Sequence, residues 1–169
     1  DNMSILGLTI DYGPYGWLED YDPQWTPNTT DAQHRRCRFG NQANMALWNL
    51  TQLANAIYPL IEEVAPLQEI LEASQLNYTI KYREMMASKV GLRDWSIIDK
   101  DFFKTLEENL TKSEIDYTLF FRELSYEGNS SAAEFWNIVL TVSYLLEEEV
   151  AKHKENWMMW YSEYADYLI

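Results

Sequence analysis

The chain has 169 residues, a net charge of −14 and an isoelectric point near 4.4. Hydrophobic residues make up 47% of it and aromatic residues 15%, which excludes a disordered chain and allows a sizeable core. The acidic balance argues against non-specific binding to nucleic acid and against docking on anionic membranes, and no stretch resembles a membrane span. The single cysteine excludes an internal disulfide framework and favours a reducing compartment.

The first fourteen residues hold two polar clusters joined by a mostly apolar run. Residues 5–10 are typical of strands, and Gly7 is placed for a turn or bulge between them. A two-stranded hairpin would bring Asp1, Asn2 and Asp11 to one edge, where their carboxylate and amide oxygens would suit Mg²⁺. From these residues alone, a plain surface hairpin is the favoured interpretation, and a metal site is the alternative.

An irregular segment follows to about residue 41, and it contains the densest basic cluster of the chain, at positions 34–38. Arg36 and Arg38 are candidates to contact a phosphate or to balance the charge of the carboxylates at Asp1 and Asp11. Pairing with nearby acidic residues of the loop is the alternative, weighted equally for these two residues and favoured for Arg35. Cys37 is expected to be a partly buried thiol, with a redox switch as the alternative.

Apolar side chains at spacings of three and four predict helices from Asn41 to the end of the chain. Pro59 is expected to kink or end the first of them, and Gly91 to cap the helix that follows Pro66. The remaining helices should occupy the second half of the chain and supply most of the core.

Three groups of polar residues carry signals that open the later helices. They are Asp99 or Asp101, Ser113 with Asp116, and Ser131 with Glu134. The last pair predicts a long helix from Ser131 to Val150. The final helix is rich in Trp and Tyr, which we interpret as a core stripe or an interface rather than a cofactor site. The acidic run at 147–149 is expected to be a solvated face.

Several strings in the first third of the chain form a specific pattern when taken together. They are Asp1–Pro14, Tyr12-Gly13-Pro14-Tyr15-Gly16-Trp17-Leu18, Tyr21-Asp22-Pro23, the set Asn28, Asp31, Arg36 and Phe39, then Asn41-Gln42 and Trp48-Asn49-Leu50. This pattern closely resembles the selenoprotein O family, also called YdiU, whose members have a kinase-like fold and transfer AMP rather than phosphate. The resemblance is diffuse after the first third and departs at Cys37 and Ala43, neither of which is expected to touch the metal.

The resemblance implies a catalytic site on the opening stretch. Asn2 and Asp11 would hold Mg²⁺ or Mn²⁺, Asp1 would be the base that takes a hydroxyl proton, and ATP would meet Asp11 through the metal. Asp11-Tyr12-Gly13 would stand where protein kinases carry Asp-Phe-Gly. The implied reaction is transfer of AMP from ATP to Ser, Thr or Tyr hydroxyls of proteins, which spacing alone does not distinguish from phosphate transfer.

The implied fold is mainly α, the C-terminal lobe of a kinase-like fold led by a short β-hairpin. We expect one domain, with the catalytic hairpin and an activation-segment-like stretch in residues 1–40 and a helical part in residues 41–169. The chain would begin at the catalytic loop of a longer parent that supplies the N-terminal lobe, and this fragment alone is expected to be inactive.

The expected partners are ATP and a hydroxyl-bearing protein substrate, with no nucleic acid and no membrane. The expected compartment is the cytoplasm or, in a eukaryote, the mitochondrial matrix. A non-catalytic helical module that binds a protein partner, or a pseudokinase fragment, is the alternative from a different class.

Overall fold

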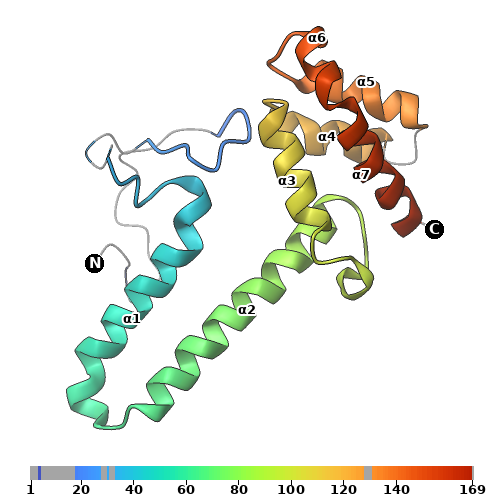
Figure 1. Cartoon of the computed structure of the whole chain (residues 1–169). Helices are drawn as coiled ribbons and strands as arrows, with labels where there is room; N and C mark the ends of the chain where they lie inside the picture. The colour runs from blue at the N-terminus through green and yellow to red at the C-terminus, as the bar shows by residue number, and fades with distance from the viewer. Residues whose placement is uncertain (1–3, 5–17, 28–29, 31–32, 128–130, 169) are drawn as a thin grey trace. The chain divides into compact units, whose positions relative to one another are not determined.

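A computed structural model describes residues 4, 18–27, 30, 33–127 and 131–168 of the chain (Figure 1). These residues are mainly helical, which confirms the predicted α class. The predicted β-hairpin falls within residues 1–14 and, apart from Ser4, lies outside the described residues, so it stays a prediction. None of the helices in the described ranges is both long enough and apolar enough to cross a membrane.

The chain divides into two compact units. Among the described residues, one unit contains Pro23–Lys81, and the other contains Leu18–Asp22 together with Tyr82–Ile169. The second unit is therefore discontinuous in sequence. The boundary predicted between residues 40 and 41 rests on the family resemblance and stays a prediction.

The first unit contains α1 (Gln42–Ile61) and most of α2 (Ala65–Lys89), whose residues from Tyr82 onward belong to the second unit. The short 3₁₀ helix η2 (Phe39–Asn41) leads into α1, and α2 begins after a three-residue connection. No charged residue occurs in α1, and within the described structure none of its side chains is buried. Pro59 lies inside α1, which ends two residues later, where Glu62 takes a left-handed conformation with φ 60°.

The C-terminal end of α2 is closed by a Schellman motif centred on Gly91, as the sequence predicted. Gly91 has φ 76°, a conformation that costs a residue without a Cβ little. The N–H of Leu92 donates to the carbonyl of Ala87 at 2.8 Å, and the N–H of Gly91 donates to Ser88 at 3.1 Å. These two bonds satisfy carbonyls that the end of the helix would otherwise leave unpaired.

The second unit is a helical bundle that contains most of the buried side chains (Figure 1). After α2, its helices are η3 (Trp95–Ile97), α3 (Phe102–Lys112), α4 (Tyr117–Glu127), α5 (Ala132–Val142), α6 (Glu147–Val150), η4 (Ala151–His153) and α7 (Lys154–Tyr167). Helix α7 packs against α3 and α5, and α5 also packs against α4. The core therefore lies between α3, α4, α5 and α7.

The aromatic residues of α7 form the centre of this core, which confirms the predicted core stripe. Trp157, Trp160 and Tyr164 are at most 2% exposed. Their polar atoms are all satisfied: Trp157 donates from Nε1 to Ser113 Oγ at 2.9 Å, and Trp160 donates to the Phe102 carbonyl at 3.2 Å. The Tyr164 hydroxyl donates to the Val90 carbonyl at 2.8 Å. Large aromatic side chains can be fully buried here because each polar atom keeps a partner.

The single helix predicted from Ser131 to Val150 is wrong, because it breaks after Val142. Ser143 is extended, and its neighbours pair with the connection between α3 and α4 through Asp116 N–H to the Val142 carbonyl (2.8 Å) and Tyr144 N–H to the Glu114 carbonyl (3.0 Å). This tertiary pairing overrides the helical spacing of the apolar residues. The predicted capping box of Ser131 with Glu134 is confirmed.

The capping box predicted for Ser113 with Asp116 is also wrong. Ser113 is buried at the C-terminal end of α3, where its hydroxyl accepts from Trp157 instead. Asp116 alone opens α4, accepting the N–H of Leu119 at 2.8 Å. Ahead of α3, Asp101 holds the cap position without a side-chain cap bond, and Asp99 accepts the N–H of Asp101.

Candidate functional site

The residues predicted to hold the metal and to act as the base lie outside the part of the chain that the structure describes. Asp1, Asn2 and Asp11 therefore stay predictions. Two neighbouring segments of the same family-like pattern are described. They are Leu18–Asp22 in the second unit and the basic loop at positions 33–42 in the first unit.

Leu18–Asp22 is held on the helical bundle by backbone pairing. The N–H of Tyr21 donates to the Ile115 carbonyl at 3.0 Å, and the N–H of Tyr117 donates to the Glu19 carbonyl at 2.9 Å. Asp20 and Asp116 form an antiparallel bridge between these bonds. The segment that follows Asp-Tyr-Gly is therefore attached to the start of α4, and Tyr21 is only 7% exposed.

The carboxylate of Glu107 on α3 is hydrogen-bonded to tyrosines from two different segments. Tyr82 of α2 donates to its Oε1, and Tyr21 also hydrogen-bonds to its carboxylate. The ring of Tyr21 stacks on that of Tyr117, with centroids 5.2 Å apart. Burial raises the pKa of Glu107 above its ordinary range, and the hydrogen bond from Tyr21 opposes that shift. We call Tyr21, Tyr82, Lys89, Glu107 and Tyr117 the Glu107 cluster.

Lys89 closes this cluster on the α2 side. Its Nζ lies 4.3 Å from the centroid of the Tyr117 ring and 4.6 Å from that of Phe121, and it donates to the Tyr117 hydroxyl at 3.2 Å. Burial lowers the pKa of Lys89. Burial, followed by the charge of Glu107, raises the pKa of Tyr117. The ammonium therefore stabilises the cluster through the faces of two aromatic rings.

Acidic side chains of the second unit do not assemble a metal site. Both carboxylate oxygens of Asp116 are engaged, one by the N–H of Leu119 and the other by the Tyr144 hydroxyl at 2.8 Å. This hydrogen bond raises the pKa of Tyr144 to about 12. Within the described ranges, His, Cys, Asp and Glu nowhere gather in groups of three that could bind a metal ion. Glu147–Glu149 are exposed on the first turn of α6, as expected of a solvated face.

The basic loop of the first unit is closed by hydrogen bonds to its own backbone. Asn41 Nδ2 donates to the Arg36 carbonyl at 2.6 Å, and Gln42 Nε2 donates to the Cys37 carbonyl at 2.7 Å. Gly40 lies against Pro23: its N–H donates to the Pro23 carbonyl at 2.8 Å, and an added Cβ would meet the Pro23 Cβ at 2.8 Å. Only glycine fits this contact without a shift of the backbone.

The three arginines of this loop, Arg35, Arg36 and Arg38, lie within four consecutive positions of the sequence. Arg36 places its guanidinium 5.2 Å from the centre of the Trp48 ring. Arg38 donates to the Arg35 carbonyl at 3.3 Å, and Arg35 donates to the Gln24 carbonyl at 3.3 Å. Guanidinium groups match the geometry of phosphate oxygens, so this loop carries side chains of the type that a phosphate contact would use. Cys37 between them is half-buried.

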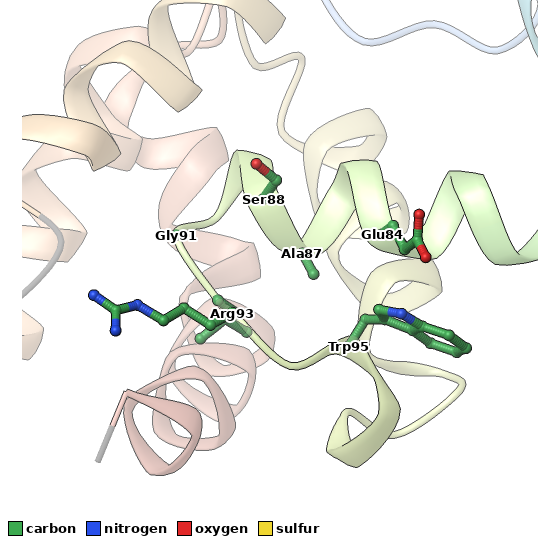
Figure 2. A pocket seen from close by; sticks show the side chains of 7 residues that line it. Glu84, Ala87, Ser88, Gly91, Arg93 and Trp95 are labelled. Atoms are coloured by element: carbon green, nitrogen blue, oxygen red, sulfur yellow. The ribbon is translucent and has the colours of Figure 1, made fainter.

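An open depression of about 580 Å³ lies beside the C-terminal end of α2 (Figure 2). Its lining includes Glu84, Ser88, Arg93 and Trp95. Figure 2 shows the Arg93 guanidinium pointing away from the Trp95 indole, while the carboxylate of Glu84 lies on the indole side. Because its charged groups do not converge, the depression lacks the arrangement that binding sites for small molecules require.

Comparison with known proteins decides the family. The family model described as "Protein adenylyltransferase SelO" matches residues 1–169, the whole chain. The chain belongs to the SelO family. It is 48% identical over 169 residues to a protein nucleotidyltransferase YdiU of Flavobacterium johnsoniae, covering 99% of the chain and 32% of that relative.

Two other relatives match the chain over a shorter length. Proteins named protein nucleotidyltransferase YdiU from Aromatoleum aromaticum and Rhodopirellula baltica are each 52% identical over 125 and 126 residues. These matches cover 74% of the chain and 24% or 23% of the relatives. The SelO-family chain thus spans about a third or less of the length of these relatives, and the resemblance read from its sequence is confirmed at the level of the family.

The Glu107 cluster was not predicted from the sequence, although one signal for it exists. Glu107 lies four residues after Phe103 and three before Leu110, both buried, so its carboxylate falls on the apolar side of α3. A carboxylate in that position needs hydrogen-bond partners. The tyrosines that supply them lie far away in sequence, and periodicity cannot identify them.

Proposed function

We propose that this chain is part of a protein adenylyltransferase that moves AMP from ATP to Ser, Thr or Tyr hydroxyls of proteins. The observation that carries the proposal is the match of the SelO family model to residues 1–169. The relatives named nucleotidyltransferases agree with nucleotidyl transfer as the class of reaction.

In this proposal, Asn2 and Asp11 hold a divalent cation, Mg²⁺ or Mn²⁺, and Asp1 accepts the proton of the attacking hydroxyl. The cation would neutralise charge that develops on the phosphate oxygens. A positioned base adds roughly 10²–10⁴-fold to such a reaction. The donor set of one carboxylate, from Asp11, and one amide oxygen, from Asn2, suits a hard cation that takes its other ligands from water and phosphate oxygens. Tyr12 and Gly13, which follow Asp11 in the sequence, would set the backbone that orients its carboxylate.

Arg36 and Arg38 are proposed to contact a phosphate or to balance the catalytic carboxylates. Their support is local: the loop is closed by Asn41 and Gln42, and the Arg36 guanidinium is held over Trp48. A guanidinium that is already ordered loses less entropy when it binds an anion. In a chain of net charge −14, this cluster is a rare basic site.

The rest of the ATP site is proposed to come from sequence outside this chain, because the chain covers only 32% of the Flavobacterium relative. The partners are then ATP and a hydroxyl-bearing protein, and the reaction would take place in the cytoplasm or the mitochondrial matrix. This fragment alone is expected to transfer nothing.

The decisive experiment uses the full open reading frame that contains this chain. The protein is incubated with Mg²⁺ and with ATP labelled at either the α- or the γ-phosphate. Asp11→Ala is the test variant, and Asp22→Ala is a matched control that removes a carboxylate from the same region. Label from the α position only, lost in Asp11→Ala and kept in the control, is the expected result. Label from the γ position only would mean phosphate transfer and would overturn the proposal.

A second function is favoured by one observation, the uncharged and unburied helix α1. A non-catalytic module that binds a protein partner would need such a surface. Under that alternative, neither α- nor γ-label reaches protein, and Asp11→Ala binds ATP no differently from the unmodified protein.

A further inference from the structure

Helix α1 is long, mostly apolar and without charge. Its 20 residues include no Asp, Glu, Lys, Arg or His, although charged residues make up 24% of the whole chain. The side chains of Asn49 and Thr51 donate to carbonyls one turn earlier in the same helix, at 2.9 Å each, so these polar groups already have partners within α1. A helix of this composition is typical of a protein interior rather than of a surface.

The described part of the first unit does not provide such an interior. Among its described residues, Leu67 of α2 is the single buried apolar side chain, and all other buried apolar side chains belong to the second unit. Within the unit, α1 packs against η2, which leads into it, and has no comparable contact with the described part of α2. Because most helical stability in proteins comes from the packing of an apolar face, α1 requires a further partner.

Exposed apolar side chains gather at the end of α1 and in the connection that follows it. Tyr58, Leu60 and Ile61 are 43%, 85% and 41% exposed, and Val64 is 52% exposed. Trp48, nearer the start of the helix, is 40% exposed. We call these five residues the α1 face. Contiguous apolar surface of this kind marks a site that another polypeptide covers.

The charges of the chain bear on which polypeptide covers the α1 face. Permanent interfaces are more apolar than transient ones, and charged residues are depleted at the centre of an interface. The absence of charge from α1 therefore favours a permanent cover. A second copy of the chain is disfavoured, because each copy carries a net charge of −14 and like charges oppose self-association.

The length of the relatives supplies a different cover. The match to the Flavobacterium relative includes 99% of this chain but only 32% of that protein, at 48% identity. About two-thirds of the relative therefore lies outside the matched region. Polypeptide on the same chain is always present at high effective concentration, which suits a permanent apolar contact.

We propose that the α1 face is an internal docking surface, covered by an apolar segment of the full open reading frame that lies outside these 169 residues. The first unit would then be one part of a larger domain, whose core forms only when that segment packs on α1. This inference does not depend on the reaction proposed above, because it concerns the packing of the full-length protein alone.

The first test measures how fast an introduced thiol reacts in the full open reading frame. Leu60→Cys, in a Cys37→Ser background, is treated with a maleimide, and the modified peptide is quantified by mass spectrometry. An uncovered face would react nearly as fast as the same thiol in urea, since Leu60 is 85% exposed in this structure. The proposal predicts a reaction at least about tenfold slower than in urea, and a smaller difference would overturn it.

Two controls show whether this protection is specific and where it comes from. Glu148→Cys places a thiol on the exposed first turn of α6 and should react at nearly its rate in urea; equal protection of both thiols would count against the proposal. Protection of Leu60→Cys should persist on roughly hundredfold dilution, because a cover on the same chain does not dissociate. Protection that disappears on dilution would identify a second copy and overturn the proposal.

The second test identifies the cover. Tyr58→p-benzoylphenylalanine, which replaces one aromatic ring by another, is photo-activated in the full-length protein, and the crosslinked peptides are mapped. The expected crosslinks join Tyr58 to sequence outside these 169 residues. Crosslinks confined to residues 1–169, crosslinks between two copies, or none at all would each overturn the proposal. Trp48→p-benzoylphenylalanine repeats the test if the first variant fails to fold.

A positive control for the crosslinking comes from the second unit. The ring of Tyr161 on α7 stacks on Phe135 of α5, with centroids 4.5 Å apart. Tyr161→p-benzoylphenylalanine should therefore crosslink to α5, within this chain, under the same illumination. This control shows that the reagent reports neighbours that the structure already gives.

The outcome is independent of the α-label experiment. If the full-length protein transfers no label while Leu60→Cys is protected and Tyr58 crosslinks outside this chain, the docking surface stands and the proposed reaction fails. If label is transferred while Leu60→Cys reacts as it does in urea, the reaction stands and the docking surface fails.

Discussion

The buried hydrogen bond between Trp157 and Ser113 should contribute measurably to stability. Both residues are fully buried, and the bond is 2.9 Å long. Ser113→Ala removes the acceptor and leaves the indole N–H unpaired in the core, which costs about 1–3 kcal/mol. If the free energy of unfolding falls by about 2 kcal/mol, the melting temperature of a protein of this size should fall by roughly 4–8 °C.

The assay is urea unfolding followed by circular dichroism for Ser113→Ala, Trp157→Phe and the double variant. Ser125→Ala is the control, because this exposed serine of α4 bonds only to the Arg122 carbonyl within its own helix. The two core substitutions should be less than additive by about 0.5–1.5 kcal/mol, since the second removes a bond already lost. A loss below about 0.5 kcal/mol for Ser113→Ala, with no coupling to Trp157→Phe, would refute the reasoning.

Three further predictions concern the second unit. Gly91→Ala should destabilise by about 1–2 kcal/mol in urea unfolding through its φ of 76° alone, since no atom lies within 4 Å of the added Cβ; a neutral effect would contradict this. Burial raises the pKa of Tyr164 to about 12, so its contribution to stability is complete below pH 10 and lost as the pH rises through 12. Tyr164→Phe should remove at most about 2.7 kcal/mol of that alkaline loss, seen in unfolding curves at pH 9 to 12, and an unchanged slope would argue against it. Burial raises the pKa of Glu107, so its contribution to stability is largest below its ordinary value of 4.5 and is lost as the pH rises through the raised value. Glu107→Gln should therefore weaken the fall of stability with pH above 4.5 in the same assay, and an unchanged fall would contradict this.

Features set by neighbours in sequence could be predicted. The Gly91 cap and the capping box of Ser131 with Glu134 depend on a few adjacent residues, and both are present. The break at Ser143 could not be predicted, because it depends on pairing with a connection nearly thirty residues earlier, and apolar spacing continues across it.

The candidate site likewise has one part that the sequence predicts and another that it does not. Local strings such as Asp11-Tyr12-Gly13 carry the resemblance to the family, which is confirmed, while the role that the resemblance implies for the opening stretch stays a prediction. The Glu107 cluster joins residues of four segments that are separate in sequence, so it could not be predicted from the sequence of any one of them. The metal ligands Asn2 and Asp11 stay predictions.

The discontinuity of the second unit has a consequence for the order of folding. Tyr21 leaves the ribosome long before Ile115, its backbone partner, which follows almost a hundred residues later. Closing a loop of that length costs roughly 4 kcal/mol of chain entropy, so this contact should form late, after the local contacts of α3 to α7. During synthesis, Leu18–Asp22 would stay unfolded and accessible to chaperones until the helical bundle on which it packs has formed. The pairing of Tyr21 with Ile115 would then be among the last contacts of the second unit to form.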